Sequence, residues 1–351
     1  MFEVNGHNVL YILLITFLSS LVLVPLSKRI AIHIGALDYP NQRKIHKRVM
    51  PRLGGLAIYA SFLIGYIFYG SLTTQMLSIL IGGFIILIMG MIDDINPLRA
   101  KYKFLVHILS ACIVVFYGKI FLTEVSMFGL YFVVPEPLNY IVSVLIIVSL
   151  INAINLMDGL DGMASGISSI YFLTIAIVAF ILNRVGGLDI ILSIIMLGAT
   201  LGFLVYNFPP ASTFMGDCGS NFLGFMISVI CLLGFKVTTF TSLIIPFVIL
   251  ALPIFDTAIS IFRRLLKGQG IAEPDREHFH HQLLKMKFSP KVSVIIIYLI
   301  NLSFAAVSIF YALGDDRFAM VIYVLLMLML LFIVLKTDIL FEHKKKDNKK
   351  K

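Results

Sequence analysis

The hydrophobic residues of this 351-residue chain fall into long, almost uncharged runs that are separated by short polar segments. Runs of about 17 to 22 apolar residues are long enough for an α-helix to cross a bilayer. We therefore predict an all-α polytopic membrane protein with eleven transmembrane helices. The predicted spans cover residues 8–26, 53–70, 76–92, 103–121, 138–156, 165–183, 189–206, 219–235, 240–262, 292–312 and 318–335. The second and eighth runs are short or contain glycine, so ten spans is an alternative.

The composition indicates a membrane protein without a large water-soluble domain. Hydrophobic residues make up 59% of the chain and charged residues only 13%, whereas soluble domains are about a quarter charged. We predict a single transmembrane domain over residues 1–335, followed by a basic cytoplasmic tail over 336–351. The three cysteines are scattered and form no pattern typical of a disulfide or a metal site.

Basic residues are distributed unevenly between the two sides that eleven spans would create. Loops 27–52, 93–103 and 263–291 and the tail hold most of the 28 Lys and Arg residues. The opposite side holds only Lys119, Arg184, Lys236 and Arg317. The positive-inside rule therefore places the N-terminus outside and the C-terminus in the cytoplasm. The net charge of +9 is then a topology signal that also attracts anionic lipid, and we expect no nucleic-acid partner.

Acidic and histidine side chains gather on the same predicted cytoplasmic side. They comprise Asp93, Asp94, Asp158, Asp161, Asp217, His278, His280 and His281. We therefore predict one polar site that faces the cytoplasm and is assembled from several loops. An ion-coupled transporter is an alternative of a different class, but its acids would lie near the bilayer midplane, and this chain shows no internal repeat.

The polar centre of the sequence is the stretch 152–166, N-A-I-N-L-M-D-G-L-D-G-M-A-S-G, between two apolar runs. Asp158 and Asp161 are three residues apart, so they would share one helical face with Asn155. Carboxylates at the end of a membrane span are costly unless a cation or a hydrogen-bond partner is bound. A simple polar helix cap would not need two Asn, two Asp and three Gly, and we therefore favour a binding site.

Two further acidic motifs point to bound cations. Asp93 and Asp94 end the third span, and adjacent carboxylates imply a metal, a cation such as Lys101 or Lys103, or a raised pKa. Asp217 lies between glycines in N-F-P-P-A-S-T-F-M-G-D-C-G-S, which starts at 207, and is typical of a metal ligand or a phosphate neighbour. In the same motif, Asn207 and Phe214 could add a hydrogen-bonding pair and a stacking face for a base. An ordinary interfacial aromatic is an equally good interpretation of Phe214.

The basic and histidine-rich segments suit phosphate recognition. The segment 46–55, H-K-R-V-M-P-R-L-G-G, places Lys47, Arg52 and their basic neighbours at the bilayer surface, where phosphate binding and plain positive-inside charge are equally good interpretations. A histidine-rich segment covers residues 273–284, E-P-D-R-E-H-F-H-H-Q-L-L. We interpret it as a binding segment for a pyrophosphate or a sugar and not as a zinc site, since no cysteine supports zinc.

The ninth predicted span contains an acidic residue in its interior. Asp256 lies within this span, which Pro246 and Pro253 should bend. A structural partner for Asp256 and a role in the site are equally open. Carboxylates, histidines and basic loops on one membrane face are typical of Mg²⁺-dependent phosphate chemistry.

Four motifs in order carry a resemblance to a known family. They are D-D at 93, N-A-I-N-L-M-D-G-L-D-G-M-A at 152, the motif at 207 and D-R-E-H-F-H-H-Q-L at 275. Together they resemble the polyprenyl-phosphate N-acetylhexosamine-1-phosphate transferases over nearly the whole chain. Within that family the chain looks like the undecaprenyl-phosphate GlcNAc-1-phosphate transferases, which start teichoic acid or O-antigen synthesis. The phospho-MurNAc-pentapeptide translocases, which usually have three consecutive histidines, are the less similar alternative.

The resemblance implies an enzyme of the bacterial cytoplasmic membrane that transfers GlcNAc-1-phosphate from UDP-GlcNAc to undecaprenyl phosphate and releases UMP. It implies Mg²⁺ as the cofactor, with Mn²⁺ as a substitute, and leaves monomer and homodimer open. Asp217 matches the family's metal ligand. Together with the charge pattern, the resemblance predicts catalytic roles for Asp93, Asp94, Asp158, Asp161, His280 and His281. It predicts substrate-binding roles for Asn155, Asn207, Phe214, Lys103 and His278, and the basic and histidine-rich segments add Arg276, Lys47 and Arg52.

Overall fold

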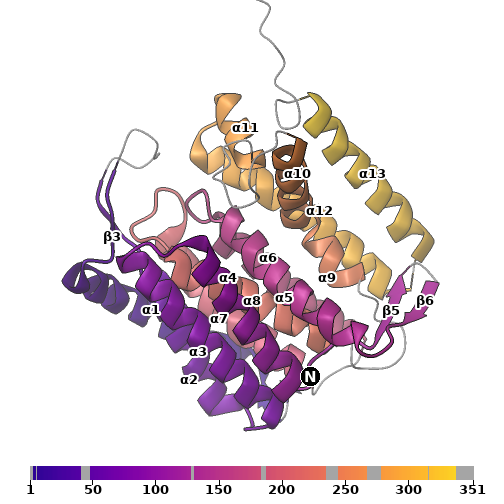
Figure 1. The fold of residues 1–351 in the computed structure, drawn as a ribbon, viewed down its shortest axis with the longest axis horizontal. Helices are drawn as coiled ribbons and strands as arrows, with labels where there is room; N and C mark the ends of the chain where they lie inside the picture. Colours follow the sequence, from indigo (N-terminus) through magenta and orange to yellow (C-terminus); the bar gives the residue numbers. More distant parts are fainter. Residues whose placement is uncertain are drawn as a thin grey trace, which may run out of the picture.

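A computed structural model describes residues 3–4, 6–40, 48–127, 130–182, 187–234, 244–266, 278–314 and 316–336. Within these ranges, nine helices are long and apolar enough to cross a membrane (Figure 1). The class of protein predicted from the hydropathy pattern, a helical multi-pass membrane protein, is therefore confirmed. A tenth apolar helix, α2 (Gly54–Tyr69), has only 16 residues.

The nine long helices follow the predicted runs closely. They are α1 (Val9–Ile34), α3 (Thr74–Ile95), α4 (Ala100–Cys112) with its π-helical continuation η1 (Ile113–Tyr117), α5 (Leu138–Met157), α6 (Met163–Ile181), α7 (Leu188–Asn207), α8 (Gly216–Gly234), α12 (Pro290–Ala312) and α13 (Asp316–Lys336). α1 continues through Pro25 and ends at Gly35, which has a left-handed φ of 77°. Residues 27–34 are thus helical, and their prediction as part of a loop was wrong.

The ninth predicted span is divided into two helices. α9 (Ile244–Ile249) and α10 (Ala251–Leu266) are separated at Leu250. Pro253 explains the break, because it has no N–H to donate to the carbonyl of Ile249 one turn earlier. Residues 240–243 lie outside the described ranges, so the count of eleven spans stays a prediction.

Short elements outside the long helices complete the described fold. α11 (Phe279–Lys285) follows α10. Three antiparallel strand pairs join β1 (Glu3–Val4) to β2 (His7–Asn8), β3 (Leu37–Asp38) to β4 (Met50–Pro51), and β5 (Glu124–Met127) to β6 (Leu130–Val133). None of these pairs was predicted, because two-residue to four-residue strands leave no periodic signal in the sequence.

α8 forms the centre of the bundle (Figure 1). All its residues except Asp217 and Gly234 are buried, and it packs against α2, α3, α5, α6 and α7. α1 lies against α2 and α7, whereas α12 covers α6 and carries α13 on its outer side. An α-helix that is apolar on every face belongs in the interior of such a bundle.

Glycines bring three neighbouring helices into backbone contact with α8. A Cβ atom on Gly55 of α2 would lie 2.2 Å from the amide nitrogen of Gly219, and one on Gly90 of α3 would lie 2.3 Å from the Cα of Cys218. A Cβ atom on Gly224 would lie 2.6 Å from the Cα of Ile151 in α5. Small residues at such positions allow membrane helices to approach closely. The beginning of α8 is therefore held tightly between α2 and α3.

We expect Gly224→Ala to lower stability by about 1–3 kcal/mol, because the added methyl group overpacks a backbone contact. The matched control in the same helix is Gly234→Ala, whose Cβ atom would meet nothing within 4 Å. The chain has no Trp, but Cys218 and Cys231 are free and buried, so a thiol-reactive dye reports thermal unfolding in detergent. Equal melting temperatures for the two variants would contradict the tight α5–α8 contact.

Candidate active site

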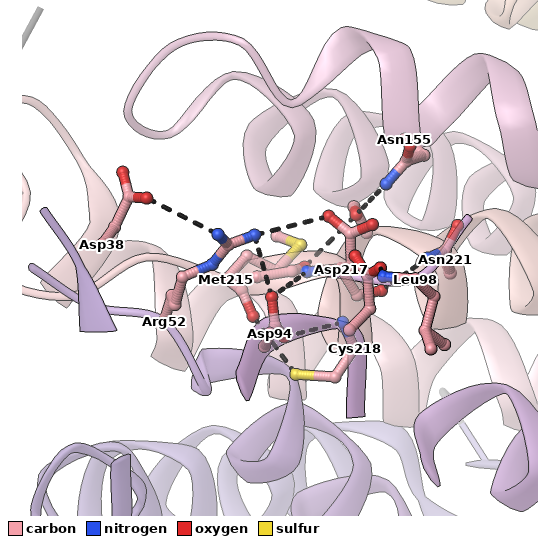
Figure 2. Close-up of polar contacts among 12 residues, drawn as sticks. Asp38, Arg52, Asp94, Leu98, Asn155, Met215, Asp217, Cys218 and Asn221 are labelled. Atoms are coloured by element: carbon pink, nitrogen blue, oxygen red, sulfur yellow. Dashed lines mark hydrogen bonds and ion pairs between the residues drawn. The ribbon is translucent and has the colours of Figure 1, made fainter. Parts of the chain in front are cut away.

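Charged side chains from four segments of the chain meet at one end of the bundle, and Figure 2 shows Arg52, Asp94 and Asp217 among them. Asp93 and Asp94 lie in the last turn of α3, and Asp217 lies in the first turn of α8. Lys103 lies in the first turn of α4, and Arg52 immediately precedes α2. The structure thus brings together five side chains that the sequence analysis selected from separate motifs.

The position of Arg52 is set by backbone pairing on both sides. Met50 and Pro51 pair with Leu37 and Asp38 in the β3–β4 ladder. On the other side, the amide of Phe214 donates to the carbonyl of Pro51 at 2.8 Å, and the amide of Gly54 donates to the carbonyl of Phe214 at 3.0 Å. The segment before α2 is therefore joined to the loop that leads into α8, and the backbone of Arg52 is held beside the start of that helix.

Two cations neutralise the carboxylates from opposite sides. The Nη2 atom of Arg52 lies 3.0 Å from Oδ1 of Asp94 and 3.6 Å from Oδ1 of Asp217, while Nη1 lies 3.5 Å from Asp38. The Nζ atom of Lys103 lies 2.8 Å from both Asp93 and Asp217. Asp217 is therefore shared by both cations (Figure 2 shows its contact with Arg52). A cluster in which four carboxylates face two cations has room for a further positive charge.

Asp94 is the structural carboxylate of this cluster. Its Oδ1 accepts the amide N–H of Asp217 at 2.8 Å, and its Oδ2 accepts that of Cys218 at 3.1 Å. These N–H groups in the first turn of α8 have no partner within the helix, and a carboxylate at a helix N-terminus also complements the helix dipole. Gly216 completes the contact, since its φ is +74° and its Cβ atom would lie 2.4 Å from Asp94.

Asp93 and Asp217 are more open than Asp94. Asp93 accepts the amide N–H of Leu98 at 2.7 Å and binds Lys103 with its other oxygen. The exposed fraction of the side chain is 0% for Asp94, 6% for Asp93 and 19% for Asp217. Asp217 is therefore the carboxylate of this group that an arriving ligand can reach most easily.

The acidic stretch 158–162 forms a turn between two helices. α5 ends at Met157 and α6 begins at Met163, so the prediction that Asp158 and Asp161 share a helical face was wrong. Gly162, the residue before α6, has a φ of +76°, a left-handed conformation that glycine adopts readily and that keeps α5 and α6 from forming one continuous helix. Burial raises the pKa of half-buried Asp158 to about 7, and the negative charges of Asp217 and Asp94 add to this shift.

Asp161 and Asn207 cross-link this turn to the loop before α8. Oδ2 of Asp161 accepts the amide N–H of Ala211 at 2.9 Å. The side-chain oxygen of Asn207 accepts hydrogen bonds from the amide of Gly162 at 3.0 Å and from Ser165 Oγ at 2.9 Å, while its nitrogen donates to the carbonyl of Thr213. Both side chains therefore hold the turn between α5 and α6 against the loop before α8.

Other predicted residues extend the site along α8. Asn155, in the last turn of α5, donates to Ser220 Oγ at 2.8 Å. Phe214 is half-buried, and its backbone joins the loop before α8 to the start of α2. Lys47 and Arg276 lie outside the described residues.

The histidines approach the acidic turn through α11. A Cβ atom on Gly159 would lie 2.4 Å from Nε2 of His280, so the imidazole packs directly on that glycine. Burial lowers the pKa of His280 well below its usual value, and the neighbouring His281 and His278 add to this shift. Both nitrogens of the neutral His280 ring are buried without a hydrogen-bond partner among the described residues. The ring of His278 is stacked on that of His280, with 5.9 Å between the ring centroids. The centroid of the His281 ring lies 4.1 Å from that of His280.

Several contributing residues were not predicted. Asp38 binds Arg52, Ser220 binds Asn155, and Asn221 Nδ2 donates to the carbonyl of Asp217 at 2.8 Å. The hydroxyl of Tyr298 in α12 donates to the carbonyl of Gly162. Ser220 is the last residue of the motif around Asp217 and Asn221 directly follows it, so both could have been inferred from helical spacing. Asp38 and Tyr298 had no such signal, because only tertiary contacts bring them to the site.

Comparisons with known proteins agree with this site. The sequence profile of glycosyl transferase family 4 matches residues 76–235, which include Asp93, Asp94, Lys103 and Asp217. Over 301 residues the chain is 41% identical to a probable undecaprenyl-phosphate N-acetylglucosaminyl 1-phosphate transferase of Bacillus subtilis, covering 83% of this chain and 82% of the relative. It is 32% identical to a decaprenyl-phosphate N-acetylglucosaminephosphotransferase of Mycobacterium tuberculosis, covering 78% and 74%. It is 27% identical to an undecaprenyl-phosphate alpha-N-acetylglucosaminyl 1-phosphate transferase of Escherichia coli, covering 84% and 81%.

The fold, the charged cluster and these similarities define a membrane-embedded enzyme that transfers a sugar phosphate. The chain belongs to glycosyl transferase family 4. The family resemblance inferred from the four motifs is thereby confirmed.

We expect Asp94→Ala to lower the melting temperature more than Asp93→Ala does. Loss of the Asp94 side chain leaves two N–H groups of α8 without their acceptor and removes the shortest of the ion pairs of Arg52, and each unsatisfied buried group costs about 1–3 kcal/mol. Loss of Asp93 leaves Lys103 paired with Asp217. Dye-monitored unfolding of both variants measures the difference. A larger loss for Asp93→Ala would contradict the structural role of Asp94.

We also predict a pH-dependent gain in stability for Asp158→Asn in the presence of a metal chelator. The pKa of Asp158 is raised to about 7 in the folded protein, so folding disfavours its ionised form. The wild-type protein therefore loses stability relative to the variant as pH rises from about 4 to about 7, and the difference stays constant above that range. Melting temperatures of both proteins at about pH 5 and about pH 8 check this. A difference that does not grow with pH would contradict the raised pKa.

Proposed function

We propose that this chain transfers GlcNAc-1-phosphate from UDP-GlcNAc to undecaprenyl phosphate, giving undecaprenyl-pyrophosphoryl-GlcNAc and UMP. The observation that carries the proposal is the partly exposed carboxylate of Asp217, held between Arg52 and Lys103 at the end of a membrane bundle. Such an arrangement can receive a metal-bound pyrophosphate from water and a phosphate from the bilayer. The reaction would be the first membrane step of teichoic acid or another cell-envelope polysaccharide.

The names of the relatives support the choice of sugar more strongly than the choice of lipid. The three relatives named above share N-acetylglucosamine phosphate as the transferred group, whereas their lipids are undecaprenyl or decaprenyl phosphate. The relative from Bacillus subtilis, which has the highest identity of the three, is named for undecaprenyl phosphate. We therefore propose undecaprenyl phosphate as the acceptor of this chain.

The donor atoms of the cluster fit Mg²⁺, although no group of three or more His, Cys, Asp or Glu side chains within the described ranges is arranged as a complete metal site. Mg²⁺ is commonly bound by one or two carboxylates together with substrate phosphates and water, and it prefers oxygen. Asp217 would hold Mg²⁺, and Asp93, which shares Lys103 with Asp217, would be a second carboxylate at the site; Mn²⁺ could replace Mg²⁺. When bound, the ion neutralises charge on the pyrophosphate.

The protein's own groups align two phosphates that would otherwise repel each other. Arg52 and Lys103 are fixed by carboxylates on one side and can offer their remaining N–H groups to phosphate oxygens. An oxygen of the lipid phosphate attacks the β-phosphorus of UDP-GlcNAc, the bond from this phosphorus to the bridging oxygen breaks, and UMP leaves with that oxygen. A phosphate monoester is largely dianionic at neutral pH, since its second pKa is about 6. No proton has to be removed, and catalysis rests on alignment and charge stabilisation.

The remaining residues complete the proposed binding site. Asn155, Asp158, Asp161, Asn207 and Phe214 form the wall that would hold the nucleotide, and His278, His280 and His281 approach the pyrophosphate and sugar from α11. For Lys47 and Arg276, the proposed contact with phosphate rests on the sequence. We propose one catalytic domain over residues 1–335 with a basic tail, eleven spans, the N-terminus outside, and the site on the cytoplasmic face. The excess of Lys and Arg in the loops at this end supports that orientation.

We expect Asp217→Asn to abolish transfer, because the amide removes the charge that neutralises Arg52, Lys103 and the bound metal. The assay measures UMP released by purified protein from UDP-GlcNAc, undecaprenyl phosphate and Mg²⁺. Glu136→Gln is the matched control, since this exposed carboxylate lies beyond the opposite end of α5 and should leave the rate unchanged. Full activity of Asp217→Asn would contradict the metal assignment.

The same assay separates the alternative activities. UDP-MurNAc-pentapeptide in place of UDP-GlcNAc should give no UMP, and UMP release from that donor alone would indicate the translocase instead. Release from neither donor would remove the proposed function and favour a transporter.

A further inference from the structure

Asp256 makes two hydrogen bonds that join α10 to the start of α11. Its Oδ2 lies 2.8 Å from Nδ1 of His278, and its Oδ1 accepts the amide N–H of Phe279 at 2.8 Å. Asp256 is 5% exposed and His278 4%, so neither bond competes strongly with water. One carboxylate therefore holds both the side chain of a histidine and the backbone of the next residue.

These bonds determine which nitrogen of His278 carries a proton. A buried carboxylate that already accepts an N–H bond with its other oxygen acts here as an acceptor, so Nδ1 must be the donor. Nε2 is left as the second polar atom of the ring, because the contact with Asp256 is made through Nδ1. Fixing one nitrogen of an imidazole in this way sets both the tautomer and the ring orientation that the other nitrogen presents.

His278 is connected to the acidic turn through the ring of His280. The planes of His278 and His280 are 3° from parallel, and His280 packs on Gly159, the residue after Asp158. The order from α10 to the site is therefore Asp256, His278, His280 and Gly159. A displaced His278 ring would shift a buried, close-packed stack that ends at the acidic turn.

We infer that Asp256 is a positioning residue for the transfer reaction, which holds His278 with Nδ1 protonated so that Nε2 faces the phosphate-bearing substrate. This inference rests on the proposed function. Asp256→Asn is the informative substitution, because its amide oxygen can keep the bond to Phe279 while its NH₂ group opposes the Nδ1–H of His278. The backbone anchor is thus retained and the tautomer preference is reversed.

The test is a double-mutant cycle with the purified full-length chain. We expect Asp256→Asn to lower kcat/KM for UDP-GlcNAc by about 10- to 100-fold, the range found when carboxylates that orient functional histidines are removed. His278→Gln should have a similar effect, and the double variant should be no more than about twofold worse than the poorer single variant. Thr257→Val is the matched control in α10, since its buried hydroxyl has no partner within the described chain. Multiplying effects, or a comparable loss in Thr257→Val, would overturn the inference.

A second measurement does not depend on activity. The ¹⁵N NMR spectrum of histidine-labelled protein in bilayers should show His278 protonated at Nδ1, assigned by its absence in His278→Gln. An unprotonated Nδ1 in the wild-type spectrum would overturn the inference. If wild-type protein released no UMP from UDP-GlcNAc, the proposed function would fail, whereas this spectrum would still decide whether His278 is protonated at Nδ1 beside Asp256.

Discussion

The structure depends on neutralising several carboxylates at the end of a membrane bundle. Removing unpaired charges from water costs several kcal/mol each, so such groups persist only where cations or N–H donors surround them. Asp217 obtains its partners from the start of α4 and the segment before α2, and Asp94 obtains its partners from the first turn of α8 and from Arg52. Four separate segments must therefore converge on one point.

Close packing makes that convergence possible. Gly55 and Gly90 let α2 and α3 touch the backbone of α8 near Cys218 and Gly219, one and two residues after Asp217. Bulkier residues at these positions would move the helices apart and lengthen the ion pairs, because interiors packed this densely do not absorb an extra methyl group freely. The same steric constraint that makes α8 the core of the fold thus sets the distances within the site.

Neighbouring residues with the same chemistry acquire different roles in this geometry. Asp93 and Asp94 are identical in type and adjacent in sequence, yet Asp94 is enclosed at the N-terminus of α8 while Asp93 pairs with Lys103. The histidines differ as well: His278 is bound by Asp256, and His280 packs against Gly159. These differences follow from which helix end each side chain meets, and no local pattern encodes that.

The sequence by itself determined the membrane class, most of the long spans and the family. Hydropathy and the order of motifs are read along the chain, and neither depends on which residues meet in the folded protein. It also selected Arg52, Asp93, Asp94, Lys103 and Asp217 as candidates. Only the tertiary structure decided that the acidic stretch is a turn, that the ninth span is broken, that Asp38 binds Arg52 and that Asp256 binds His278. The bonds from Asp217 to Lys103 and Asp94 join residues 114 and 123 positions apart, and such separations are set by helix packing.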